Sequence, residues 1–346
     1  MRAALRHPAA WWALLVLGCL PWAWLLAQTL LDQLGPNPAE ALIRATGDWT
    51  LRSLCVVLAV SPLRTWLGWP ELLRFRRMLG LLVFVGTGSW IYYNTRVLNQ
   101  FTTADQQMDI RADYEKTLKK HQDDPILVAT DVKATVDIVP EQRLVRAHVV
   151  QQMTNKFSTP ISKMLVHLPE YSREVTIKVP GATLSGIDPR FNTAWLEFST
   201  PLAPGAVTTV EMSLLRQTQG FVDSNVDTAL VENGTFINNS QLLPQFGYQP
   251  GMELQDRHER NKRELAPVQR AYKLEDSSRY NESGFGRGED FIQFEMTLST
   301  APDQIAIAPG YLQKEWLENG RKYFHYKMDK PMFNFYSFLS ARLAVK

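Results

Sequence analysis

The sequence contains little cysteine and lacks the usual signatures of an active site. Its 346 residues include two cysteines, Cys19 and Cys55, and both lie in the apolar N-terminal third. The remainder therefore has no thiol to form a disulfide or to bind a metal ion, which suits a disulfide-free extracytoplasmic domain and equally a cytosolic one. No Ser-His-Asp set and no phosphate-binding loop occurs. These absences leave few candidates for catalysis.

Basic residues are not clustered with aromatic residues anywhere in the chain, although such interleaving is typical of nucleic-acid-binding surfaces. We therefore expect no nucleic-acid partner. The net charge of +2 hides an uneven distribution, because residues 1–98 carry +5 and residues 99–346 carry −3. This division separates a basic apolar part from a mildly acidic polar part.

Charge is absent altogether from one long N-terminal stretch, Trp11 to Leu31. About 20 apolar residues at ~1.5 Å per residue match a hydrocarbon core of ~30 Å. A secretory signal would be shorter and would end in small residues. The sequence therefore predicts a membrane-spanning helix over about 11–31, with a kink at Pro21.

Two weaker apolar stretches follow, over about 49–66 and about 78–98. Arg52 lies one turn inside the first, where its side chain can reach the interface, and Pro62 is expected to break the far end. The second ends in a tryptophan and two tyrosines, which suit the headgroup level of a bilayer. We predict three spans within a transmembrane region over 1–98.

Arginines mark the side of the membrane on which each loop lies. They gather before the first predicted span and between the second and third, whereas the loop after the first span has only Arg44. By the positive-inside rule the N-terminus and the arginine-rich loop are cytoplasmic, and everything after Asn99 is outside. The arginines that decide this are Arg2, Arg6, Arg64, Arg74, Arg76 and Arg77.

Four short sequence segments follow one another between Asn37 and Leu81: NPAEAL, TGDWTLR, SPLR and RRMLGL. Their order and spacing resemble the heme-binding membrane subunit of the bacterial methionine sulfoxide reductase system. The resemblance implies a ferric-reductase-like helical bundle that passes electrons across the membrane through b-type heme. Such a heme needs axial ligands, normally histidines on facing helices.

The chain departs from this family at the heme ligands. The family places a histidine near the position of Trp90, but the third predicted span contains none, and His7 is the histidine nearest to any span. Cys19, Cys55 and Met78 are potential iron ligands, yet a single Cys or Met in an apolar helix more often packs against lipid or a neighbouring helix. We therefore expect that this part does not hold heme b.

Beyond the spans the sequence becomes polar and its periodicity changes. Residues 99–126 have helical composition and are predicted to form a solvated stalk. In 132–138 apolar and polar residues alternate, as in a half-buried strand. Short runs of the same kind, separated by Pro and Gly, predict an antiparallel sandwich over 127–346. These runs are 144–153, 161–168, 175–179, 193–198, 207–215, 291–298, 304–308, 321–328 and 333–345.

A second set of sequence segments is distributed between Gly86 and Lys346. It resembles the outer β domain of aminopeptidase N type zinc peptidases, most closely the version fused to bacterial ABC transporter permeases. The resemblance implies that a zinc-binding catalytic domain follows this domain in the family. The segments are GTGSWIYYNTRVLNQF, DIRADYEKTLKKHQDDP, NGTFINNSQLLPQFGYQPGMELQDRHERNKREL, APDQIAIAPG and MDKPMFNFYSFLSARLAV.

The zinc motif of that family is absent. H-E-x-x-H places two imidazoles one helical turn apart toward the metal, but in RHERNKRE the second position is Lys262. We interpret His258 and Glu259 as a solvated pair in a charged loop. The remaining strand histidines, His148, His167 and His325, are interpreted as structural or surface residues. We therefore expect no zinc site and assign no catalytic, cofactor-binding or metal-binding residue.

The two resemblances meet between Leu81 and Gly86, inside one apolar stretch. This predicts a fusion and a membrane-anchored chain of mixed class, with transmembrane helices before a mainly antiparallel all-β sandwich of the aminopeptidase N type. The favoured function is a non-catalytic tethered domain, truncated before the zinc site, in the bacterial inner membrane with its C-terminal domain periplasmic. Its expected partners are the bilayer and a catalytic peptidase domain, ABC transporter subunits or a peptide.

Two alternatives stay open. The first is a heme-binding redox subunit, and the second is a zinc aminopeptidase or transporter component that acts with a missing domain or partner. If a catalytic domain normally covers one face of the sandwich, an exposed apolar patch should remain near the C-terminus. The residues predicted for this patch are Phe324, Phe333, Phe335 and Phe338.

Overall fold

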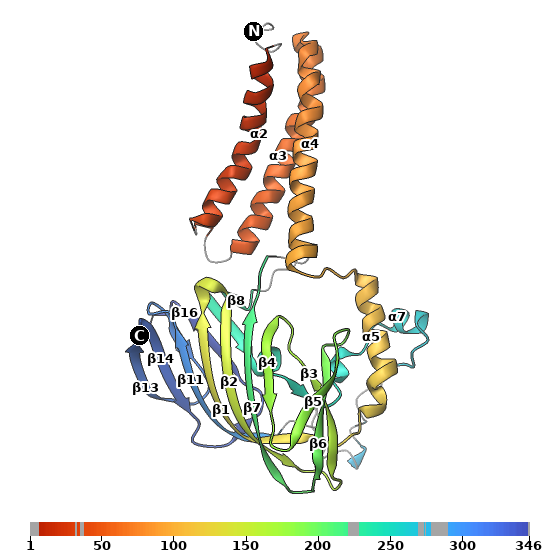
Figure 1. Cartoon of the computed structure of the whole chain (residues 1–346), viewed down its shortest axis with the longest axis vertical. Coiled ribbons are helices and arrows are strands. Elements are labelled where there is room, and N and C mark those ends of the chain that lie inside the picture. Colours follow the sequence, from red (N-terminus) through yellow and green to blue (C-terminus); the bar gives the residue numbers. More distant parts are fainter. Residues whose placement is uncertain are drawn as a thin grey trace. The chain divides into compact units, whose positions relative to one another are not determined.

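The computed structural model describes residues 7–31, 33–34, 38–220, 228–268, 273, 275–277 and 290–344. These residues belong to two compact units (Figure 1). The first contains Met1–Phe101 and Gln219–Thr228, and the second contains Thr102–Thr218 and Ala229–Lys346. Helices followed by a mainly β domain confirm the predicted order of the chain.

Helices make up the first unit. They are α2 (Pro8–Leu30), α3 (Pro38–Leu67), the 3-10 turn η1 (Pro70–Leu72), α4 (Leu73–Tyr92) and the π-helical turn η2 (Tyr93–Leu98). Helix α2 begins with His7 as its N-cap, where Nδ1 accepts a hydrogen bond from the Ala9 amide at 3.1 Å. Helices α3 and α4 share a hydrogen bond between the hydroxyls of Thr50 and Thr87, at 3.1 Å.

One helix within the described ranges, over Pro8–Thr29, is long and apolar enough to cross a membrane. The second predicted stretch lies in α3, which begins at Pro38, well before the predicted start near residue 49. The expectation that Pro62 ends this helix is wrong, because α3 continues to Leu67. A proline removes one hydrogen bond of the helix, and the other bonds of a 30-residue helix remain.

The second unit is built from short helices and many strands. Its helical elements are α5 (Ala104–Leu118), η3 (Lys119–His121), η4 (Pro140–Gln142), α6 (Asn239–Leu242), η5 (Pro250–Met252) and α7 (Arg257–Lys262). Its first strands are β1 (Leu127–Val139), β2 (Leu144–Asn155), β3 (Ile161–His167), β4 (Ser172–Lys178), β5 (Ala182–Asp188), β6 (Thr193–Leu202) and β7 (Val207–Gln217). The others are β8 (Leu230–Val231), β9 (Gly234–Asn238), β10 (Gln245–Phe246), β11 (Phe291–Thr300), β12 (Ile305–Ile307), β13 (Tyr311–Glu318), β14 (Arg321–Lys327), β15 (Met332–Phe333) and β16 (Ser337–Ala341).

The strands form three sheets that share one core. The large sheet has the order β13-β14-β11-β1-β2-β7-β4, with β15 also paired to β11. The two smaller sheets have the orders β10-β3-β6-β5 and β12-β16-β9-β8. Neighbouring strands are antiparallel apart from β1 and β11, which run parallel. Alternate residues of β1 are buried in a core to which all three sheets contribute, so one face of the large sheet is covered.

The apolar runs predicted most of the longer strands near their observed positions, but β5, β8, β9, β10 and β13 were missed. Strand β5 carries Gly186 at φ +58° and an irregular register toward β6, which interrupt the alternation. Strand β13 is exposed on both faces for nearly its whole length. Because alternation reflects one buried face, a strand without a buried face does not show it.

The solvated stalk predicted for residues 99–126 is wrong where it covers α5. This helix forms, but it buries Ala112, Tyr114, Glu115 and Leu118. Tyr114 and Leu118 belong to a small core with Leu165 of β3. Helix α5 is therefore part of the β domain, and the polar composition of its sequence concealed the packed face.

The predicted C-terminal aromatic patch is also wrong for half of its residues. Phe324 and Phe338 are 1% and 0% exposed, because they lie on the core-facing sides of β14 and β16. Phe333 is half-buried, and Phe335, between β15 and β16, is 54% exposed. The four phenylalanines therefore do not form one exposed patch.

Candidate functional site: a buried ionic network

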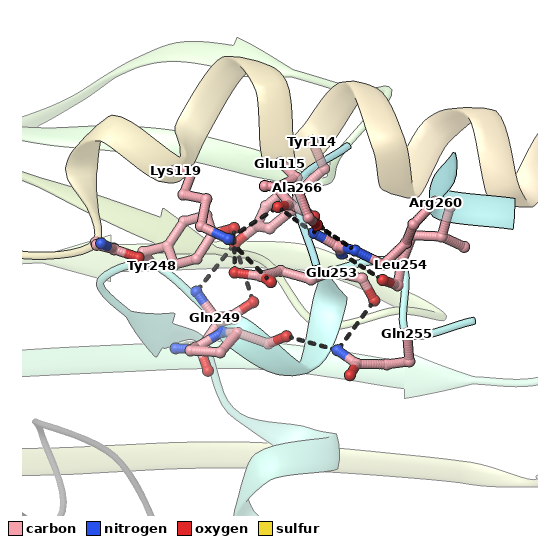
Figure 2. A network of polar contacts seen from close by, with 12 residues as sticks. Tyr114, Glu115, Lys119, Tyr248, Gln249, Glu253, Leu254, Gln255, Arg260 and Ala266 are labelled. Carbon is pink, nitrogen blue, oxygen red and sulfur yellow. Dashed lines mark hydrogen bonds and ion pairs between the residues drawn. The ribbon is translucent and has the colours of Figure 1, made fainter. Parts of the chain in front are cut away.

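The densest polar cluster that we find lies where α5 meets the segment 245–266. Thr103 begins α5 with a capping box, in which its side chain and backbone exchange hydrogen bonds with Gln106. The helix then turns Glu115 and Lys119, which are four residues apart, to the same side. Both side chains point toward the segment that contains η5 and α7 (Figure 2).

Glu115 and Arg260 form the centre of this ionic network. Arg260 Nη1 donates to Glu115 Oε2 at 2.7 Å and Nη2 donates to Glu115 Oε1 at 2.8 Å. The two side chains are 4% and 1% exposed. Arg260 also donates to the carbonyls of Leu254 and Ala266. Two parallel bonds between a guanidinium and a carboxylate fix their relative orientation, so α7 is held in one position against α5.

A second carboxylate, Glu253, and a second cation, Lys119, complete the network. Lys119 Nζ donates to Glu115 Oε1 at 2.8 Å and to Glu253 Oε2 at 3.3 Å. The hydroxyl of Tyr248 donates to Glu253 Oε1 at 2.9 Å. Figure 2 shows these groups converging beneath α5. Two carboxylates therefore face two cations, and the formal charges of the four side chains sum to zero.

Aromatic residues surround the ionic network. Tyr114 stacks on Tyr248 with ring centroids 5.1 Å apart, and it meets Phe191 edge to face. The amide of Gln249 donates to the Tyr114 hydroxyl at 2.9 Å. That hydroxyl also shares a hydrogen bond with Nε2 of His167, at 3.2 Å. This histidine, at the end of β3, thereby connects the second sheet to the network.

Burial and hydrogen bonds shift the pKa values of several groups in and around the network. Burial favours a raised pKa for Glu115, but hydrogen bonds from Arg260 and Lys119 outweigh it and lower that pKa. The hydrogen bond to Glu115 raises the pKa of Arg260. Burial lowers the pKa of His167 to about 4 and raises the pKa of Tyr114. The carboxylate is thus held ionised and the histidine neutral, an arrangement that favours rigidity over proton transfer.

The structure places the His-Glu pair of the sequence, His258 and Glu259, close to Arg260 of this network. His258 and Glu259 do not lie in a loop, as predicted, but in α7, whose N-cap Asp256 accepts a hydrogen bond from the Glu259 amide. His258 is exposed, and Glu259 forms an ion pair with Arg263. Lys262 occupies the position one turn after His258, where the motif requires a second imidazole. These residues do not fit a zinc ion.

No group of three or more His, Cys, Asp or Glu side chains that could hold a metal ion occurs within the described ranges. His148 on β2 is exposed and shares a hydrogen bond with Ser213, at 3.0 Å. His325 on β14 shares one with Glu295, at 2.9 Å. Both histidines, like His167, lie on strands, in agreement with the sequence interpretation.

The helices of the first unit do not supply a fitting set of heme ligands. His7 is occupied as the N-cap of α2. Cys19 is half-buried and Cys55 is exposed on their helices, and Met78 is half-buried on α4. Trp90 stands at the position where a ligand histidine was expected. A pair of facing imidazoles is therefore not available between residues 8 and 100, and we derive no chemistry through heme.

Comparison with curated proteins matches the N-terminal part of the chain to one family. This chain is 59% identical over 80 residues to the protein-methionine-sulfoxide reductase heme-binding subunit MsrQ of Polaromonas naphthalenivorans, and the match covers 23% of this chain and 36% of that protein. It is 52% identical over 71 residues to MsrQ of Herminiimonas arsenicoxydans, covering 20% and 33%. The chain thus spans about a third of the length of these relatives. No protein-family model matches the chain.

Comparison with solved structures gives M1 zinc metallopeptidases. One from Deinococcus radiodurans has a TM-score of 0.39 and 10% identity, covering 63% of this chain and 43% of that chain. A mutant of that enzyme bound to a Tyr-Ser-Ala substrate has a TM-score of 0.39 and 11% identity, with the same coverage. The resemblance found in the N-terminal part of the sequence therefore recurs among the curated relatives.

Proposed function

We propose that this chain is a non-catalytic β domain tethered to a membrane by its N-terminal helices, with the β domain on the extracytoplasmic side. In this proposal the domain presents a surface to a peptide or to a partner protein, such as a peptidase domain linked to an ABC permease. The observation that carries the proposal is the attachment of α5. This helix directly follows the first unit in the chain and is held in the β domain by the buried Glu115–Arg260 pair.

The attachment makes the connection between the two units short. Only residues 99–103 separate the end of η2 from the start of α5. Five residues span at most ~18 Å even when fully extended. A short connection of this kind suits a domain that is anchored through its N-terminal helices. Helix α2 has the length and composition of such an anchor.

The proposal assigns no reaction step to zinc or heme. Lys262 stands where the zinc motif needs histidine, and the helices present no facing imidazoles. The ionic network is electrically balanced and its groups are engaged with one another, so it supports a structural role. A binding or presenting function therefore accounts for the described residues better than catalysis does.

A heme-binding redox subunit is the second candidate, and the identity of 59% over 80 residues to MsrQ favours it. The name of that relative describes heme binding by the relative. The matched segment covers 36% of it. The donor residues present in this chain argue against the same role here.

Protease digestion of intact spheroplasts tests the proposed topology. The full chain, expressed in a bacterium with an epitope after Lys346, is expected to remain in the membrane fraction after alkaline extraction. Proteinase K added outside is expected to remove the epitope, while a cytoplasmic control protein stays intact. A chain that is released by alkaline extraction, or an epitope protected until the spheroplasts are lysed, would contradict the tethered extracytoplasmic arrangement.

A further inference from the structure

Strand β13 ends the large sheet and has β14 as its neighbour on one side; the described residues place no strand on its other side. The backbone of an edge strand carries N–H and C=O groups that can pair with another strand. At eight residues, β13 is long for an exposed edge strand. An edge of this kind is a candidate surface for strand addition.

The side chains of β13 are exposed on both faces of the sheet. Its register with β14 places Glu315 and Leu317 opposite Phe324 and Lys322, on the side that faces the core further along the sheet. Leu317 is nevertheless 67% exposed, so the core does not extend beneath β13. The strand therefore extends beyond the packed core and is accessible from both faces of the sheet.

The opposite face of β13 carries an ordered row of three side chains, Lys314, Trp316 and Glu318. Lys314 Nζ lies 4.9 Å from the centroid of the Trp316 ring, and Trp316 Nε1 donates to Glu318 Oε2 at 3.2 Å. Trp316 also stacks on Tyr323 of β14, with centroids 5.1 Å apart and planes at 13°. The row is thus held in place, with a cation at one end, an indole in the middle and an anion at the other end.

We propose that β13 pairs antiparallel with β13 of a second copy of this chain, about a two-fold axis at Trp316. A cation–indole–anion row read in the opposite direction is an anion–indole–cation row, so the surface is complementary to itself. Lys314 of each copy then faces Glu318 of the other, and the two Trp316 side chains are neighbours across the axis. Opposed residues of antiparallel strands point to the same face, which keeps the row continuous. The contact uses the same patch on both copies, as a two-fold dimer requires.

The other face of β13 is compatible with this register. Leu317 of each copy lies opposite Glu315 of the other and diagonal to the second Leu317. Glu315 already has a partner in its own chain, because Lys322 Nζ lies 2.7 Å from its Oε1. No carboxylate is therefore left without a cation when the two leucines approach. The exposed Leu317 side chains gain a neighbour that they lack in the single chain.

Two features of β13 are typical of edges protected against pairing, namely a bulge and a lysine. The bulge falls between Leu312 and Lys314, outside the five-residue overlap 314–318. Lys314, in turn, faces an anion in the proposed register. These devices therefore disfavour other registers of strand addition and leave this one available.

Charge reversal tests the proposal on the full chain purified in detergent, by sedimentation velocity over a range of protein concentrations. The unaltered chain is expected to form a dimer. Lys314→Glu and Glu318→Lys each replace two opposite-charge contacts by like-charge contacts, and each is expected to weaken the dimer Kd by about tenfold or more. The double variant Lys314→Glu/Glu318→Lys restores the complementary order and is expected to return to within about threefold of the original Kd. Lys178→Glu, on the opposite edge strand β4, is the matched control and should leave the Kd unchanged.

A monomeric unaltered chain, or single reversals without effect on the dimer, would overturn the proposal, as would a double variant no tighter than the single ones. If a single variant loses its far-UV circular dichroism, Trp316→Cys in a chain with Cys19→Ala and Cys55→Ala provides the second test. Mild oxidation by copper phenanthroline should link the two copies through residue 316 in a dimer that reducing agent separates. Failure to cross-link, with the variant folded, would equally overturn it. The proposal is independent of the membrane topology proposed above.

Discussion

Replacement of Arg260 by methionine is expected to lower the free energy of unfolding by about 3–5 kcal/mol, the usual consequence of removing one partner of a buried ion pair. The side chain is 1% exposed and donates two bonds to the carboxylate of Glu115. Without it, Lys119 is left as the one cation between Glu115 and Glu253. The two buried carboxylates then have one cation between them, and the uncompensated negative charge is the physical cause of the loss.

Urea unfolding of the full chain in detergent, followed by far-UV circular dichroism, measures this loss. Lys262→Met on the same helix is the matched control, because its side chain is 57% exposed and the change should stay within about 0.5 kcal/mol. The double variant Glu115→Met/Arg260→Met leaves Lys119 and Glu253 as a neutral pair and should recover much of the stability. An Arg260→Met chain as stable as the Lys262→Met chain would show that the network does not hold α7 to α5.

Acidification is expected to destabilise the β domain through His167. The pKa of this imidazole falls from 6.5 to about 4 on folding, because burial disfavours its charged form. Between these values the unfolded chain binds a proton that the folded chain does not, so stability is lost as the pH falls from 6.5 toward 4. The shift corresponds to roughly 2–3 kcal/mol across this window. Carboxylates such as Glu115, whose pKa is lowered on folding, add a further loss in more acidic solution.

The variant His167→Gln isolates this contribution, because an amide can replace the hydrogen bond to Tyr114 without taking up a proton. Its unfolding free energy should vary less with pH between 6.5 and 4 than that of the unaltered chain. His148→Gln is the control for the substitution itself, since that imidazole is exposed on β2. Equal pH dependence in all three chains would show that His167 takes up its proton as readily in the folded domain as in the unfolded chain.

Sequence periodicity predicted most of the β domain, and the reason is visible in β1. Val132, Val136 and Ile138 alternate with polar residues because one face of the large sheet is buried and the other faces solvent. The parallel pairing of β1 with β11 was not predictable in this way, since periodicity describes one strand and not its neighbour. Phe324 and Phe338 were misassigned to the surface because the patch was predicted from the expected loss of a covering domain, whereas both residues lie on the buried sides of their strands.

The candidate site was missed by sequence reasoning. Glu115 and Arg260 are separated by 145 positions, and each lies in a stretch whose composition is typical of a solvated surface. The available signal was the spacing of Glu115 and Lys119, four residues apart on a helix with Tyr114 beside them. That spacing indicates an ion pair on a helix face, but it does not show that the face is buried. The expectation that zinc and heme ligands are lacking, by contrast, could be derived from the sequence, because it depends on residue identity at a few positions such as Trp90 and Lys262.

The heme and zinc content of the full chain, purified from membranes of cells supplied with a heme precursor and zinc, tests the central claim most directly. The claim is that the helices and the β domain form a tethered unit without a resident heme or zinc ion. Pyridine hemochrome spectra and elemental analysis of the folded chain are predicted to give heme and zinc far below one per chain. One heme or one zinc ion per chain, retained through purification, would contradict the account.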